Sequence, residues 1–169
     1  MTLRLSGLAV ALLWLGCSNP EEARCEAYTF VHQGGGTNHM ASCADPSCGN
    51  GLNPPTAGQH CGSTTSCRVH DAEVGRCLWI HNLEHGHAVL AYNCPEGCPE
   101  IVAGLQEIWD AAPSPKRMLI TPDPNLPTRV AAVVWGYSHS ADTVDPEAIG
   151  CLLLHQDEAA PEAGLGCSQ

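Results

Sequence analysis

The sequence has little positive charge. It contains seven lysines and arginines but 18 aspartates and glutamates, which gives a formal net charge of -11 over 169 residues. A chain this acidic repels the phosphates of nucleic acids and anionic membrane surfaces, so we expect no nucleic-acid partner. The same excess of acid attracts cations. Histidine is comparatively abundant, with nine copies.

Long apolar runs are also lacking, because the run at residues 8–15 is too short to span a bilayer. With Arg4 before it and Gly16 after it, residues 1–16 read as a signal peptide. Residues 13–17 resemble the bacterial lipobox, in which the cysteine, here Cys17, is lipidated and becomes the mature N-terminus. We therefore expect residues 17–30 to be a lipidated tether, and the protein to lie in the bacterial cell envelope, lipid-anchored in the outer membrane or periplasm. The alternative is an ordinary secretory peptide and a secreted protein.

The chain lacks the C-x2-C spacing of cysteine zinc sites and of redox enzymes, although it has 11 cysteines. If Cys17 carries lipid, ten remain, and an even number in an exported chain predicts disulfides. Five bridges are the simplest arrangement, and the sequence does not tell which cysteines pair. Oxidised cysteines cannot act as thiolate ligands, which leaves the histidines as candidate metal donors.

Regular structure is expected mainly in the second half of the chain. Residues 32–67 are rich in Gly, Pro, Asn, Ser and Cys, which predicts a long irregular segment ordered by cross-links. Apolar patterning then predicts strands at 77–80, 88–92, 117–121 and 129–137, and helices at 99–111 and from Asp145 onward. The predicted fold class is α+β, a small β-α-β-β-α sheet domain preceded by a disulfide-stapled, loop-rich N-terminal half. The single domain is expected to cover residues 31–155, followed by a loose polar tail at 156–169 in which Cys167 is a possible staple.

Residues 81–86, with the sequence His-Asn-Leu-Glu-His-Gly, carry the strongest chemical signal. Two histidines and a carboxylate lie within five residues, and zinc and copper(II) take such ligands. We predict a metal site, for zinc or copper, that is built by loops. The predicted site residues are His39, His60, His81, Glu84 and His85, with Glu84 either a ligand or an acceptor that orients an imidazole.

Two other interpretations of these histidines remain open. His81, Glu84 and His85 have the H-x-x-E-H form of a zinc hydrolase, in which glutamate acts as the base. That chemistry needs a helix, and Gly86 leaves room for only about two turns, so this reading is disfavoured. Alternatively, the histidines only hydrogen-bond backbone carbonyls, and the chain is a surface structural or interaction domain without metal. Its protein partner is unknown. Nucleophilic catalysis has no support, because the chain lacks a G-x-S-x-G motif.

Several short motifs together resemble an uncharacterised bacterial family, a domain of unknown function. Residues 53–60 resemble its N-P-P-T-S-G-P-H pattern, residues 81–86 its H-S-L-E-H-G pattern, and residues 134–136 its A-W-G pattern. Ala57 and Gln59 differ from the first pattern, and Cys61 replaces its following tyrosine. The resemblance covers roughly residues 30–155. It implies no particular activity, only that the five predicted site residues belong together.

Overall fold

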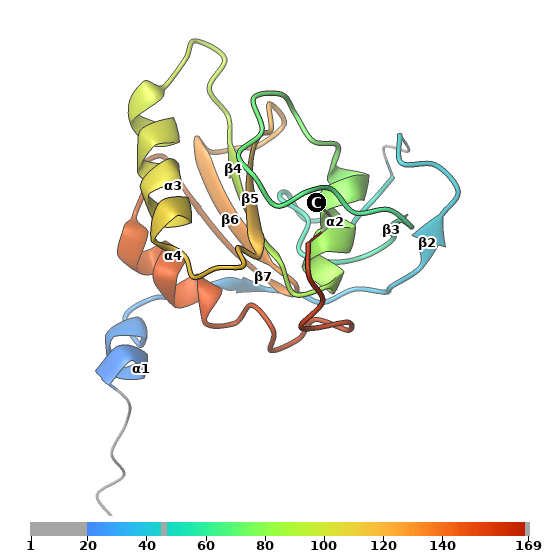
Figure 1. Cartoon of the computed structure of the whole chain (residues 1–169), viewed down its shortest axis with the longest axis horizontal. Coiled ribbons are helices and arrows are strands. Elements are labelled where there is room, and N and C mark those ends of the chain that lie inside the picture. Colours follow the sequence, from blue (N-terminus) through green and yellow to red (C-terminus); the bar gives the residue numbers. More distant parts are fainter. Residues whose placement is uncertain (1–19, 45–46, 168–169) are drawn as a thin grey trace, which may run out of the picture.

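A five-stranded mixed sheet lies at the centre of the molecule (Figure 1). The structure is a computed structural model that describes residues 20–44 and 47–167, so the expected signal peptide and Cys17 lie outside the described residues. The strand order is β1-β7-β6-β4-β5; β4 and β5 are parallel, and the other neighbours are antiparallel. The strands are β1 (Val31–His32), β2 (His39–Met40), β3 (His60–Cys61), β4 (Ala88–Tyr92), β5 (Met118–Pro122), β6 (Val130–Val134) and β7 (Tyr137–Ala141). The helices are α1 (Pro20–Cys25), α2 (Arg76–Glu84), α3 (Pro99–Ala111) and α4 (Pro146–Leu153).

Helices cover both faces of this sheet. Alternate side chains of a strand point to opposite faces, so Leu90 and Ala132 pack with α3 and α4, whereas Val89 and Val133 pack with α2. A sheet buried on both faces needs strands that are apolar throughout, and β6 is buried at all five positions. The predicted α+β class and the central position of this apolar run are confirmed.

The two predicted helices are confirmed in detail. The amphipathic pattern placed a helix at 99–111, and α3 has those bounds. For the other, the side chain of Asp145 accepts hydrogen bonds from the backbone N–H groups of Glu147 and Ala148, at 3.0 Å each. This is the expected N-cap, and Pro146 follows it at the first helical position.

Two predicted strands need correction. Residues 77–80 are not a strand but part of α2. This helix is buried on its sheet side and also under the N-terminal loops, so it lacks the one-sided apolar pattern by which helices are recognised. The run at 129–137 is not one strand either. It turns at Trp135 and Gly136, where Gly136 has a φ of +84°, and continues as β7.

All ten cysteines in the described residues form disulfides, as predicted. The pairs are Cys25–Cys151, Cys43–Cys61, Cys48–Cys77, Cys67–Cys167 and Cys94–Cys98. Three of them fix the irregular N-terminal half: Cys43–Cys61 joins this segment to itself, Cys48–Cys77 joins it to α2, and Cys67–Cys167 joins it to the C-terminal tail. Cross-links thus hold a segment whose described residues form only short strands of two residues each.

Both ends of the described chain contact the domain. The Cys25–Cys151 disulfide attaches α1, which lies within the expected tether, to α4. The C-terminal tail is held by Cys167 and by Asp157, which receives two hydrogen bonds of 2.8 Å from Arg117. Figure 1 shows this tail crossing α2. The helices in the described residues are all too short or too polar to cross a membrane.

Candidate metal centre

Helix α2 presents two of the predicted site residues on one side. His81 and Glu84 are three positions apart, a spacing that brings side chains together on a helix surface. The carboxylate of Glu84 is only 3% exposed. The site is therefore not built by loops alone, as predicted, because α2 supplies His81 and Glu84. The helix that the H-x-x-E-H reading requires is present up to Glu84.

Strand pairing brings the other two histidines to this helix. The parallel pair of β2 and β3 aligns His39 directly with His60. Gly58 permits the turn before β3, with a φ of +107°, and a Cβ atom there would lie 2.2 Å from the backbone of Gly49. The N-P-P-T-A-G-Q-H motif therefore forms the mostly buried turn that places His60 in the site. Glycine is required at position 58 because the backbone of Gly49 leaves no room for a side chain.

Three imidazoles surround one carboxylate oxygen. The ring centroids of His39, His60 and His81 lie 4.8–4.9 Å apart, so the rings form a nearly equilateral triangle. The Nε2 atom of each ring approaches the Oε2 atom of Glu84, at 3.3, 2.9 and 3.7 Å respectively. One ligand atom from each of the four residues lies within 4.8 Å of all the others, a geometry that could hold a metal ion.

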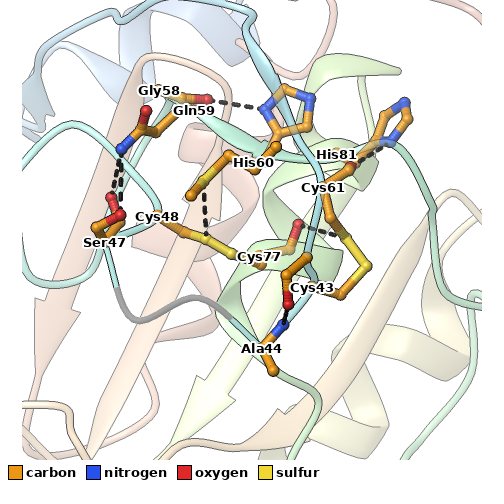
Figure 2. Close-up of a disulfide and its surroundings, with 12 residues drawn as sticks. Cys43, Ala44, Ser47, Cys48, Gly58, Gln59, His60, Cys61, Cys77 and His81 are labelled. Carbon is orange, nitrogen blue, oxygen red and sulfur yellow. Dashed lines mark hydrogen bonds between the residues drawn. A yellow bond between two sulfur atoms is a disulfide. The ribbon is translucent and has the colours of Figure 1, made fainter.

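Backbone carbonyls fix the tautomers of two of these rings (Figure 2). The Nδ1 atom of His60 lies 2.8 Å from the carbonyl oxygen of Gly58, and Nδ1 of His81 lies 2.9 Å from that of Cys61. A carbonyl oxygen only accepts, so each Nδ1 carries the proton. In the neutral ring Nε2 then holds the lone pair, and in both residues this atom faces Glu84. Histidine ligands of metals are usually oriented by such a hydrogen bond on the far nitrogen.

Burial sets the electrostatics of the site. Desolvation, followed by repulsion from His85, lowers the pKa of His81 below its ordinary value. The side chain of His60 is fully buried, whereas that of His39 is 48% exposed. Three of the four residues are therefore buried, and the site reaches solvent at His39. The carboxylate of Glu84 is buried among these rings, and a buried carboxylate is costly unless hydrogen bonds or a cation pair with it.

His85, the fifth predicted residue, lies beside this group and not in it. It is the C-cap of α2, and its Nε2 atom lies 3.2 Å from the Oε2 atom of Glu162. Its ring centroid is 4.6 Å from that of His81. His81, His85 and Glu162 form a second group whose ligand atoms lie within 4.8 Å of one another. The structure thus gives the two histidines of H-x-x-E-H different surroundings.

Sequence reasoning missed the residues that support the site. Glu162 lies 77 positions beyond His85 in a segment that reads as a polar tail, so no local signal indicates it. Asn82 bonds both backbone groups of Thr65, which fixes the loop leading away from β3. His87 donates from Nε2 to the carbonyl of Leu165 in the tail, and its Nδ1 atom lies 3.1 Å from Nδ2 of Asn82.

The comparison with family models shows to which protein family the chain belongs. The model "Protein of unknown function (DUF3105)" matches residues 42–169. The chain belongs to this family. The match confirms the resemblance to a domain of unknown function and extends through the C-terminal tail, which includes Glu162. It begins after His39, so that residue precedes the matched segment. Neither the curated proteins nor the solved structures yielded a match.

Proposed function

We propose that this protein is an exported, lipid-anchored domain that binds one zinc or copper(II) ion without catalysing a reaction. The ligands are the Nε2 atoms of His39, His60 and His81 and the Oε2 atom of Glu84. The observation that carries the proposal is the convergence of three imidazole nitrogens on one buried carboxylate oxygen. Nitrogen and oxygen donors of this kind suit both metals.

The spacing of the donors supports a four-coordinate ion. Ligand atoms at 2.0–2.1 Å from a tetrahedral zinc lie about 3.3 Å from one another. The three distances from the histidine nitrogens to Glu84 are 2.9, 3.3 and 3.7 Å, which bracket that value. Hydrogen bonding alone explains the arrangement less well, because a single carboxylate oxygen would then face three ring nitrogens in a largely buried space.

Two features favour binding over hydrolysis. A catalytic zinc site keeps one position open for water, whereas here four side chains converge. In the H-x-x-E-H hydrolase reading Glu84 is a free base and His85 is a ligand. Glu84 instead lies among the nitrogens, and His85 pairs with Glu162.

Zinc titration of the chelator-treated protein tests this proposal. We expect one ion per chain for the wild type. Glu84→Gln and His60→Gln should each weaken binding by more than the roughly 10–100-fold that loss of a hydrogen bond to a ligand causes. His70→Gln is the matched control, because His70 is also buried and bonds the carbonyl of Ser66. If Glu84→Gln bound zinc as tightly as the wild type, Glu84 would not be a ligand.

The location at the membrane rests on residues 13–17 and on the disulfides. Five bridges require an oxidising compartment, which supports export. Cys17 supplies the only membrane contact in this proposal, through its acyl chains. Cys17→Ser should move the protein from the membrane fraction to the soluble fraction, measured by cell fractionation and N-terminal mass analysis. A wild-type protein released with an unmodified N-terminus would contradict the anchor.

A further inference from the structure

His81 belongs to two groups of potential ligands at once. The inner group contains His39, His60 and Glu84, and the outer group contains His85 and Glu162. The Nδ1 atom of His81 is committed to the carbonyl of Cys61, so its Nε2 atom alone is free to ligate. One nitrogen lone pair binds one ion, and the two groups therefore cannot both be occupied through His81.

Exposure rises along four of these residues, from Glu84 to Glu162, whereas His39 of the inner group is itself 48% exposed. The side chain of Glu84 is 3% exposed, those of His81 and His85 are 9% and 16% exposed, and that of Glu162 is 51% exposed. Glu162, His85, His81 and Glu84 thus form, in this order, a series of potential ligands that leads from solvent to the buried carboxylate.

The outer group is held in place by the folded tail. The backbone N–H of Glu162 donates to the carbonyl of Glu84, the last residue of α2, at 2.9 Å. Arg117 donates to the carbonyl of His85 and to Asp157, which fixes the end of the helix and the start of the tail together. The Cys67–Cys167 disulfide attaches the C-terminal end of the tail to the loop that follows β3. The backbone of Glu162 is therefore fixed beside the end of α2, and its carboxylate pairs with His85.

We propose that His81, His85 and Glu162 form an outer cation position through which the metal ion enters and leaves the inner site. This inference rests on the proposed function. The ion first binds the outer group, keeps its bond to Nε2 of His81, and exchanges His85 and Glu162 for Glu84, His60 and His39. No electron is transferred, and the ligand atoms donate as neutral imidazoles and carboxylates throughout.

An entry position changes rates without changing affinity. Since the outer group is only an intermediate, removing it raises the barrier equally in both directions. His85→Gln and Glu162→Gln should each slow zinc uptake and zinc release by the same factor. We expect about tenfold, the lower end of the effect that local charge has on association rates. The equilibrium dissociation constant should stay the same.

The experiment is a stopped-flow measurement on the disulfide-intact full chain. Zinc uptake by the chelator-treated protein is followed after mixing, and zinc release is followed by transfer to an excess of chromogenic chelator. The matched controls are His155→Gln and Glu158→Gln, because these residues form another histidine–glutamate pair at the surface and carry the same charge. The controls separate a ligand position from the general attraction of an acidic protein for cations.

The outcomes distinguish the two proposals. Equal slowing of both rates in the outer variants, with unchanged controls, supports the entry position. Unchanged rates would mean that zinc enters past the exposed His39, and a change in the dissociation constant alone would make His85 and Glu162 members of the inner site; either result overturns the inference and leaves metal binding intact. A wild type that binds no zinc would overturn the proposed function itself.

Discussion

Replacing Cys67 and Cys167 together by alanine is expected to lower the free energy of unfolding by about 4–5 kcal/mol. This bridge spans 100 residues, so its removal restores a large amount of chain entropy to the unfolded state. The folded state also loses the closure of the tail that carries Glu162. The measurement is equilibrium denaturation in guanidinium chloride with the other four bridges intact.

The matched control is the short bridge between Cys94 and Cys98, which spans four residues. The same chain-entropy relation gives about 2 kcal/mol for replacing this pair by alanine. Cys98 is buried in the core, so its replacement also loses packing contacts. That loss destabilises the control variant further and therefore cannot produce the expected difference between the two bridges. Equal losses from the two double variants would contradict the view that the long bridge acts by restricting the unfolded chain.

Zinc should raise the stability of the wild type strongly. At a free zinc concentration 1,000 times the dissociation constant, binding to the folded state alone adds about 4.1 kcal/mol. For a domain of this size that corresponds to a rise in melting temperature of about 10 °C. The effect should weaken at acidic pH, because protons compete with zinc for the histidine nitrogens. Burial lowers the pKa of His81, so protons compete for this ring at a lower pH than for a free imidazole.

Glu84→Gln separates the metal from the fold in this experiment. The substitution keeps the size of a buried side chain and removes its carboxylate, so the metal-free variant should be about as stable as the metal-free wild type. The zinc-dependent increment should nevertheless disappear. His70→Gln, which lies outside the site, should retain it. A Glu84→Gln variant that zinc stabilises as much as the wild type would count against the ligand set.

Periodicity in the sequence predicted the parts of the fold that have one exposed side. Helix α3 and the N-cap of α4 were recognised because apolar residues repeat on one face and a capping aspartate precedes a proline. Helix α2 escaped recognition because Trp79 and Leu83 face the sheet while His81 and Glu84 face the loops, so seven of its nine residues are buried. The apolar run at its start then resembles a strand.

The candidate site was partly predictable for a different reason. Histidine and glutamate at close spacing indicate metal chemistry wherever they stand, so His60, His81 and Glu84 could be named without knowing the helix. Their mutual geometry could not be predicted, because it depends on the pairing of β2 with β3 and on two disulfides. The role of Glu162 depends on the path of the tail, which is fixed by long-range contacts that leave no local pattern.

X-ray absorption at the zinc edge tests the central claim most directly. The zinc-loaded wild type should show one zinc per chain with four light ligands, three imidazole nitrogens and one carboxylate oxygen, at about 2.0–2.1 Å. Multiple scattering from three imidazole rings should be visible, and sulfur at about 2.3 Å should be absent because the cysteines of the described chain are paired. A sulfur shell, a six-coordinate shell of oxygen, or a protein that retains no stoichiometric zinc would contradict the claim.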